Sequence, residues 1–430
     1  HPMSISDILF GCEVREGNLT ILPALLKARF PYGNYLVLTD EESALALGKV
    51  LKKILKKLVL VIGEGEDILP LFASPDAVTC VLGAGKAVSA ARYFACARSL
   101  PFVAVSLSCK PEGLLRGTVT VTAGGKRAEY PVPPPHLVFA DAEKMCENGE
   151  GIRLAQTFLL ASELSLFSFE AERLLKLQSA KDKNESSREN SPIAEGAGNP
   201  RRASENRGRA LSDANGEGLF SLLSAACALF DESVKEEKEK SGEAAFSEER
   251  KEESVFSPQA AEALFRAVLT AEYCFRSGFP EGEIFCFASL ASRFFERSFE
   301  KVLFPCACAL AELYALFFDG GFYRGGKVDY NARLKEAETL AEKTGFFADS
   351  AYIPTAEELK GYAENFDGCK KILSEKIARI EEKIEKHKKR AEDVFSKTEK
   401  NALGKILRLL PELSLSTYGI AALMRDFSLL

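Results

Sequence analysis

Short, continuous apolar runs alternate with helix-spaced runs through the first 150 residues. The helix-spaced run from Glu42 to Lys57 places leucine, valine and isoleucine three and four positions apart. Continuous apolar strands joined by helices are typical of a parallel sheet covered on both faces. The pattern therefore predicts an α/β domain over residues 1–148 with a largely parallel sheet. The expected strands lie at residues 35–40, 58–63, 77–82, 102–107 and 137–141.

One segment of this domain has a different rhythm. Between Thr118 and Pro131 the apolar residues Val119 and Val121 alternate with polar ones, and Gly124-Gly125 follows. Alternation that ends in a glycine pair is typical of a two-stranded hairpin. The sequence predicts an antiparallel β-hairpin here.

Beyond residue 149 the strand patterns end and helical spacing dominates, which predicts an all-helical domain over residues 149–365. Two polar stretches interrupt it, at 178–217 and 232–255. Serine, glycine and charged residues there bury too little apolar surface to offset the entropy of ordering, so both are expected to be mobile loops. The expected helices lie at residues 152–177, 218–232, 257–277, 284–318, 331–344 and 355–365.

Residues 366–430 are expected to form a C-terminal helical arm. Within it, the segment 370–396 carries apolar residues in alternating steps of four and three, with Lys and Glu between them. That is a heptad seam. Packing of the arm on the helical domain, or a coiled coil with a partner or a second copy of the chain, would each explain it. The seam residues are Leu373, Ile377, Ile380, Ile384, His387, Ala391 and Val394.

Composition narrows the range of functions. A formal net charge of -6 and a pI near 5.6 argue against a nucleic-acid partner, because binding to the phosphate backbone needs a basic surface. By inspection, no apolar run is long enough to span a bilayer, and no secretory signal pattern opens the chain. We therefore expect no membrane association and a cytoplasmic location. The 11 cysteines lie mostly in apolar runs and are expected to be reduced packing residues.

The candidate chemistry begins at a glycine-rich turn. The run from Val81 to Ala95 predicts a strand, a turn made by Gly83, Ala84, Gly85 and Lys86, and then a helix. Such turns let the backbone approach a phosphate, and free N–H groups at the helix start attract its charge. On its own the G-x-G pattern is weak evidence, because a plain strand-to-helix turn has the same sequence.

The order of the following segments is more specific. After the turn come a strand at 101–107, the stretch from Ser108 to Gly113, the hairpin, a proline run, and the strand 137–141. This order resembles the glycerol-1-phosphate dehydrogenases of the dehydroquinate synthase-like, or iron-containing alcohol dehydrogenase, superfamily. The resemblance implies that fold, an NAD or NADP cofactor, a small phosphorylated substrate, and a nucleotide site in the cleft between the two domains.

By position in that family, Asp40 is expected to face the adenosine ribose, with Gly83, Ala84 and Gly85 under the pyrophosphate. Lys86 is expected to pair with a phosphate or to fill the pocket with its own charge. The chain also departs from the family pattern at several positions. The aspartate that ends the turn is Ser89, the threonine on the nicotinamide side is Leu107, and the substrate-facing aspartate is Glu112.

The metal ligands implied by the resemblance are missing from the sequence. The family uses one aspartate and two histidines, and the matching positions hold Ile152, Phe285 or Cys286, and Phe304-Pro305. The chain has only three histidines, at His1, His136 and His387, without ligand spacing between any pair. We expect no bound metal.

Three hypotheses follow. The leading one is a degenerate relative that keeps the fold, has lost metal-dependent oxidation, and retains binding of a nucleotide or phosphorylated metabolite. The second is an oxidoreductase that works without metal, with Lys86, Lys110 and Glu112 as candidate catalytic residues. The third is an interaction protein that recruits a partner through the heptad arm.

Overall fold

The computed structural model describes residues 11–31, 33–52, 59–61, 66–73, 78–186, 217–228, 256–319, 356–388, 402–404 and 406. The chain divides into two compact units. Unit 1 comprises His1–Leu159 and Ala225–Ser277, and unit 2 comprises Leu160–Ser224 and Gly278–Leu430. Each unit is described by itself. Residues 225–277 group with unit 1, although the sequence pattern assigned them to the helical domain.

Unit 1 contains a six-stranded sheet in which every pair is parallel, in the order β1-β8-β5-β4-β2-β3. This confirms the predicted α/β fold class, and all five expected strands are present. The first strand, β1, has no counterpart among them. The strands are β1 (Glu13–Glu16), β2 (Tyr35–Thr39), β3 (Val59–Val61), β4 (Cys80–Ala84), β5 (Phe102–Ser106) and β8 (Leu137–Ala140).

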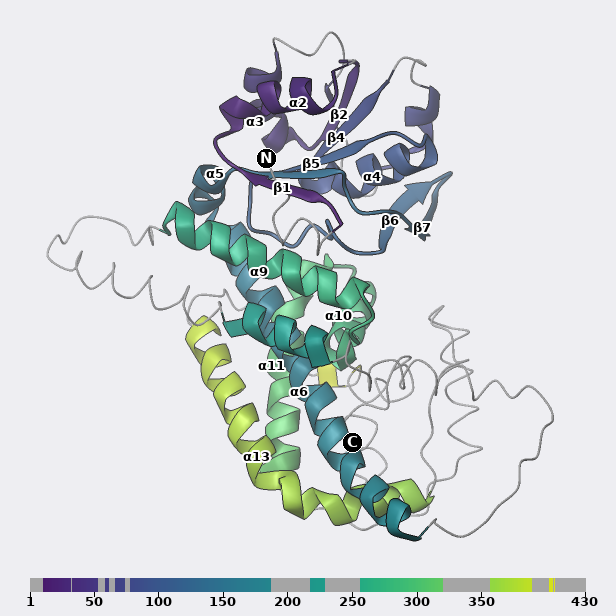
Figure 1. Cartoon of the computed structure of the whole chain (residues 1–430), viewed down its shortest axis with the longest axis vertical. Coiled ribbons are helices and arrows are strands. Elements are labelled where there is room, and N and C mark those ends of the chain that lie inside the picture. Colours follow the sequence, from purple (N-terminus) through teal and green to yellow (C-terminus); the bar gives the residue numbers. More distant parts are fainter. Residues whose placement is uncertain are drawn as a thin grey trace, which may run out of the picture. The chain divides into compact units, whose positions relative to one another are not determined.

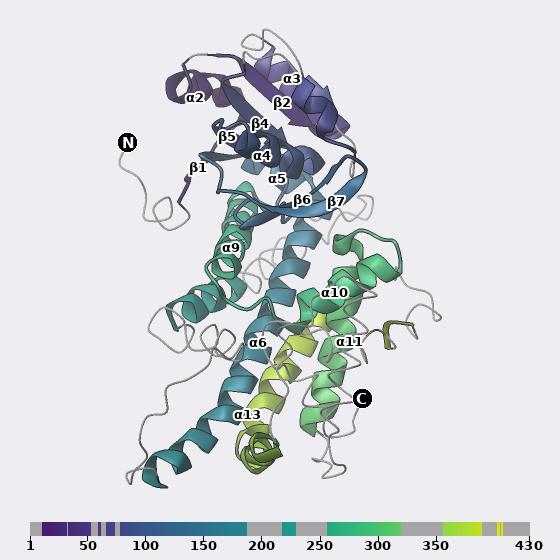
Figure 2. The same cartoon turned by 90° about the vertical axis from the view of Figure 1, so that its right-hand side faces the viewer.

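Helices cover both faces of this sheet (Figures 1 and 2). On one face, Leu22 and Leu26 of α2 and Leu47 of α3 join a buried cluster with strand residues such as Val37 and Val103. On the other face α4 packs along β4, β5 and β2. Double coverage explains why the central strands are apolar throughout. The helices are α2 (Leu22–Arg29), α3 (Glu41–Leu51) and α4 (Val88–Ala97).

The predicted hairpin is confirmed as β6 (Thr118–Ala123) and β7 (Lys126–Pro131), paired antiparallel. Its turn residues Gly124 and Gly125 have φ of +61° and +73°, which favours glycine. The Asp67 carboxylate holds this turn, because it accepts hydrogen bonds from the Gly124 amide at 3.0 Å and the Gly125 amide at 2.8 Å.

Unit 1 is completed by helices. They are α5 (Ala142–Glu147), the start of α6 (Gly149–Ser186) and α9 (Pro258–Arg276). Ser257 caps α9 by accepting from the Ala260 amide, and Pro258 occupies its first turn. Helices α5 and α9 pack against each other.

Unit 2 contains the rest of α6 together with α10 (Gly282–Phe294), α11 (Phe299–Asp319) and α13 (Ala356–Lys388). The prediction of a single helix at 284–318 is wrong, because α10 ends at Phe294 and α11 begins at Phe299. Glu296 adopts φ +51° at this break, and Pro305 lies inside α11. A further helix spans Glu217–Ala228 and begins one residue before the expected start.

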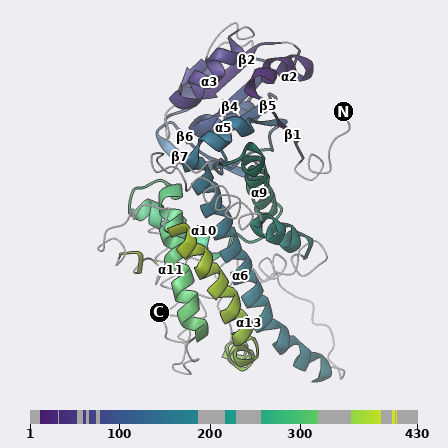
Figure 3. The ribbon, with the colours of Figure 1, turned by 90° about the vertical axis from the view of Figure 1, so that its left-hand side faces the viewer.

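The helix expected at 355–365 and the described part of the heptad segment, residues 370–388, belong to one continuous helix, α13. The described seam residues are buried, Leu373 and Ile377 among them. Helix α13 packs on α11, and its Lys383 pairs with Glu163 of α6 at 2.7 Å. Figures 2 and 3 show α6, α11 and α13 running alongside one another. Of the two explanations for the seam, packing within the chain accounts for residues 373–387, while Ala391 and Val394 lie outside the described residues.

The predicted loop at 178–217 is wrong at its start, because α6 continues to Ser186. The remainder of that stretch up to residue 216, the stretch 232–255, and the helix expected at 331–344 lie outside the described residues.

One described helix, α11, is long and apolar enough to cross a membrane, so the expectation that no run reaches that length was wrong. Of its most apolar window, 56% is buried inside the protein. Buried helices at the centre of a water-exposed fold have the same composition, and Leu310, Tyr314 and Phe318 of α11 lie in the interior.

Candidate functional site at the carboxyl edge of the sheet

The order in which successive strands are added to the sheet reverses between the neighbouring strands β2 and β4. The connection after β2 leads to β3, while the connection after the adjacent β4 leads to β5 on the opposite side. In open parallel sheets, ligands bind outside the carboxyl ends of the strands where the order reverses in this way. Asp40 follows β2, and Gly85 and Lys86 follow β4, so the structure brings the predicted cofactor residues together at this point.

The Asp40 carboxylate joins the starts of two helices. Its Oδ1 accepts from the Ser43 amide at 2.9 Å and caps α3. Its Oδ2 accepts from the Lys86 amide at 2.9 Å, at the 3-10 turn Gly85–Ala87 that leads into α4. That second helix start has no side-chain cap of its own, because Ala84 occupies the capping position. Two sets of backbone donors thus hold one negative charge.

The pKa of Asp40 reflects these contacts. Partial burial by itself would raise this pKa, but hydrogen bonds from the Lys86 and Ser43 amides and the charge of Lys86 outweigh it, and the pKa is lowered. Lys86 itself is exposed. The corner formed by Asp40, Gly85, Lys86 and Ser43, which we call the Asp40 corner, therefore stabilises an anion.

The two glycines of the turn have different roles. Gly85 has φ +56°, and a Cβ there would lie 2.1 Å from Asp40 Oδ2. Gly83 is buried, and a Cβ there would lie 2.7 Å from the Ala91 side chain and 2.9 Å from the Phe102 ring. Gly85 therefore permits the Asp40 contact, while Gly83 permits close packing of α4 on the sheet.

The loop after β5, residues 107–117, carries Lys110 and Glu112. Ser106 Oγ donates to Glu112 Oε2 at 3.4 Å and to the Ser108 carbonyl at 3.0 Å, sharing its hydrogen between them. Ser108 Oγ accepts from the Lys110 amide at 3.0 Å. The start of α6 passes close by, since a Cβ on Gly151 would lie 2.8 Å from Ser108 Oγ. Lys110 and Glu112 thus lie on the loop after β5, the strand that neighbours β4 in the sheet.

Two buried charged residues that the sequence analysis did not select hold this loop. Arg92 of α4 and Glu272 of α9 are each 1% exposed, and both bind the backbone of residues 113–116. The available signal was a single charge within an apolar helical run, as in Ala90-Ala91-Arg92-Tyr93-Phe94. Nothing in the sequence indicates that these two positions, 180 residues apart, converge.

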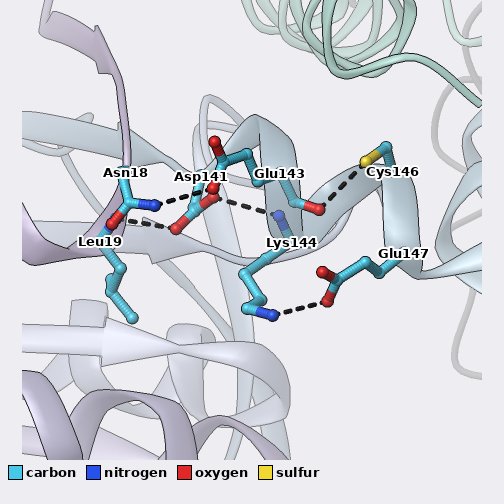
Figure 4. Close-up of polar contacts among 7 residues, drawn as sticks. All are labelled: Asn18, Leu19, Asp141, Glu143, Lys144, Cys146 and Glu147. Carbon is cyan, nitrogen blue, oxygen red and sulfur yellow. Dashed lines mark hydrogen bonds and ion pairs between the residues drawn. The ribbon is translucent and has the colours of Figure 1, made fainter.

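A second carboxylate, Asp141 after β8, has a structural role (Figure 4). It is 1% exposed and accepts from the Leu19 amide at 2.8 Å and the Lys144 amide at 3.1 Å. Nearby, the Asn18 side-chain amide donates to Glu143 at 2.8 Å. Asp141 thereby caps α5 and ties the turn after β1 to the end of β8.

The positions that match the family's metal ligands hold residues that are poorly suited to bind metal. Ile152 and Phe285 are buried and offer only carbon, and Phe304 packs against the ring of His387. Burial raises the pKa of the Cys286 thiol to about 12, which disfavours the thiolate that binds metal. Across the described part of the chain, no group of three or more His, Cys, Asp or Glu side chains could hold a metal ion.

Two further polar groups, one in each unit, have structural roles. His136 Nδ1 accepts from the Phe102 amide at 3.2 Å, so this ring nitrogen holds the start of β5. In unit 2 the Tyr314 hydroxyl donates to the buried Glu283 carboxylate. Burial, and then the nearby Glu283 charge, raise the pKa of Tyr314 well above its ordinary value.

Comparison with known proteins finds one curated relative and several solved structures. No family model matches the chain. Glycerol-1-phosphate dehydrogenase [NAD(P)+] of Bacillus licheniformis is 26% identical over 193 residues, which are 41% of this chain and 47% of that protein. The chain thus matches about half the length of its curated relative. This similarity confirms the resemblance predicted from the order of the motifs.

Among solved structures, sulfoacetaldehyde reductase from Bifidobacterium kashiwanohense in complex with NAD+ is 11% identical, with a TM-score of 0.49 and coverage of 95% of this chain and 96% of that one. Iron-containing alcohol dehydrogenase from Corynebacterium glutamicum is 14% identical, with a TM-score of 0.47 and coverage of 96% and 97%.

Proposed function

We propose that unit 1 binds an adenine dinucleotide, NAD or NADP, at the carboxyl edge of its sheet, and that the chain is a glycerol-1-phosphate dehydrogenase-like protein that has lost metal-dependent oxidation. The observation that carries the proposal is the Asp40 corner, where backbone amides from two helix starts hold one anion at the reversal of strand order. The curated relative, a dehydrogenase of NAD(P)+, supports the choice of ligand class.

The residues present fit a dinucleotide. The Lys86 amide already donates to an anion, and a phosphate oxygen offers the same kind of acceptor. Gly85 has no side chain, so the Asp40 carboxylate reaches the Lys86 amide at this turn, and Lys86 adds a positive charge beside it. Once the phosphate takes the Lys86 amide, the Asp40 carboxylate can accept hydrogen bonds from the adenosine ribose hydroxyls. The bound cofactor would supply hydride chemistry.

The residues do not fit a catalytic metal. Such a metal polarises the substrate hydroxyl so that hydride can leave carbon. Isoleucine and phenylalanine have no lone pair, and the half-buried Cys286 thiol has its pKa raised by burial. We therefore propose that the chain binds a nucleotide, together with a small phosphorylated metabolite, without oxidising it.

The experiment is calorimetric titration of the full chain with NAD+, NADH, NADP+ and NADPH, using wild type, Asp40→Asn and Asp67→Asn. Asp67 is the matched control, because it also binds the amides of a glycine turn but lies at the hairpin. Loss of charged hydrogen bonds to ribose is expected to weaken binding about 10- to 100-fold in Asp40→Asn. Asp67→Asn should bind like wild type. Equal affinity for all three proteins, or tighter binding by Asp40→Asn, would refute the assignment.

A second experiment, with added metal ions, tests the proposed loss of metal-dependent oxidation. Glycerol-1-phosphate oxidation is followed with NAD+ and NADP+ after addition of Zn²⁺, Ni²⁺ or Fe²⁺, and bound metal is measured by elemental analysis. We expect no metal-stimulated turnover and no stoichiometric metal. About one metal ion per chain, lost in Cys286→Ala, would instead revive the hypothesis of an active metalloenzyme.

A further inference from the structure

We propose that the buried pair Arg92 and Glu272 positions the loop after β5 for the end of the dinucleotide remote from its adenosine. Both are positioning residues, since their side chains bind the backbone of their own chain. The inference rests on the proposed nucleotide site. It adds two residues that position the loop contacting the second nucleoside of the dinucleotide.

Glu272 binds the backbone amides of the loop, and Arg92 binds its backbone carbonyls. Glu272 accepts from the Gly113 amide at 2.8 Å and from the Leu115 amide at 2.9 Å. Arg92 donates to the Gly113 carbonyl at 2.9 Å and to the Arg116 carbonyl at 2.7 Å. The backbone N–H and the carbonyl of Gly113 are therefore both bound, and Gly113 has φ +68°, which few other residues adopt.

These bonds are shielded from water because both side chains are buried. Burial lowers the pKa of Arg92 to about 10, still well above neutrality, so the guanidinium stays protonated. Burial raises the pKa of Glu272, while the Leu115 amide, Arg116, the Gly113 amide and Arg92 oppose the rise. A buried charge whose partners are lost is costly, so the loop is held in one conformation.

The two residues connect this loop to the elements around it. Arg92 lies on α4, the helix that begins at the glycine turn, and also donates to the Pro133 carbonyl at 2.8 Å. Glu272 lies on α9, which receives a second anchor where Cys109 Sγ donates to the Ala261 carbonyl at 3.3 Å. The loop that carries Lys110 and Glu112 is thereby set relative to the Asp40 corner through one helix.

The order of strands in the sheet indicates which half of the ligand would lie near this loop. Strand β4 lies between β2 and β5 in the sheet. A dinucleotide with its adenosine ribose at Asp40 and its phosphates at Gly85 therefore extends its other nucleoside toward β5 and residues 107–112. Displacement of this loop should weaken contacts with that nucleoside and leave the adenosine half unchanged.

The experiment compares affinities for a whole ligand and for half of it. NADH and ADP are titrated into wild type, Arg92→Lys and Glu272→Gln. Lysine presents a point charge in place of a fork of donors, and glutamine accepts through one oxygen only. Arg98→Lys, on the end of the same helix, and Glu262→Gln, on α9, are matched controls with exposed or half-exposed charges. We expect NADH affinity to fall about tenfold or more in the two test variants, with ADP affinity within about twofold of wild type.

Equal loss of NADH and ADP affinity, or no loss of either, would overturn the inference. If wild type binds neither ligand, the proposed nucleotide site itself fails, and this inference falls with it. Should both variants fail to fold, hydrogen exchange on wild type still decides: bound NADH, but not ADP, should slow exchange in residues 107–117. No slowing by NADH, or equal slowing by the two ligands, would contradict the proposal.

Discussion

The Asp40 corner and the positions that match the family's metal ligands differ in what they require of the sequence. At the corner the donors are main-chain amides of Ser43 and Lys86, supplied by helix starts at the carboxyl edge of a parallel sheet. At the metal positions the donors would be side chains, and Ile152 and Phe285 supply none. Backbone-based binding survives many substitutions, whereas coordination is lost with a few. A chain can therefore keep one and lose the other.

The largest expected effect is at Gly85. In Gly85→Ala the new Cβ would lie 2.1 Å from Asp40 Oδ2 in a left-handed backbone, so the corner must open. We expect a loss of about 2–4 kcal/mol in the free energy of unfolding and the loss of measurable nucleotide binding. Denaturant unfolding and calorimetry measure the two effects.

The matched control is Gly125→Ala in the hairpin turn, which has φ +73° but open space around the Cβ position. It should cost about 1 kcal/mol and leave nucleotide affinity unchanged. If the two variants behave alike, the contact between Gly85 and Asp40 has no special role.

A smaller effect is expected from Tyr314→Phe in unit 2. It removes the hydrogen bond to the buried Glu283 carboxylate and keeps the ring contacts with Phe167. Bonds to charged groups contribute about 1.5–3 kcal/mol, so unfolding should become easier by that amount. Nucleotide affinity should not change, because the corner lies in unit 1. A large loss of nucleotide affinity without a loss of stability would place Tyr314 in the ligand site. It would contradict the assignment of nucleotide binding to unit 1 alone.

The smallest effect concerns pH. The pKa of Asp40 is lowered in the folded chain, so its ionised form is bound more favourably there than in the unfolded chain. The resulting stabilisation is present above the ordinary pKa of 3.8 and is lost as pH falls through the lowered value. Asp40→Asn should therefore lose less stability than wild type below pH 3.8. Melting temperatures between neutral and acid pH test this, and parallel curves would contradict it.

The sequence predicted the parallel sheet and the hairpin, because apolar runs and glycine turns are local signals. Asp40, Gly85 and Lys86 were selected by their positions in the family pattern, and the hydrogen bond from the Lys86 amide to Asp40 was not predicted. It missed β1, where the alternation Glu13-Val14-Arg15-Glu16 is mostly polar in an edge strand. It also missed the break at Glu296, which has neither glycine nor proline to mark it. Turns set by tertiary packing leave little trace in a sequence.

Arg92 and Glu272 were missed for a related reason. Each occurs as one charge in an apolar helix, and their common target, residues 113–116, is visible only when α4 and α9 are placed against the loop. A charge on the buried face of a helix was a signal available in the sequence. Its partners were not.

The most direct test of the account is a titration of NADH into the full chain after treatment with a chelator, followed by nicotinamide fluorescence. We expect saturable binding of about one NADH per chain, with an affinity that Zn²⁺, Ni²⁺ or Fe²⁺ leaves unchanged. Binding that appears only after metal is added, or no binding under either condition, would contradict the claim that the nucleotide edge has been kept while the metal site has been lost.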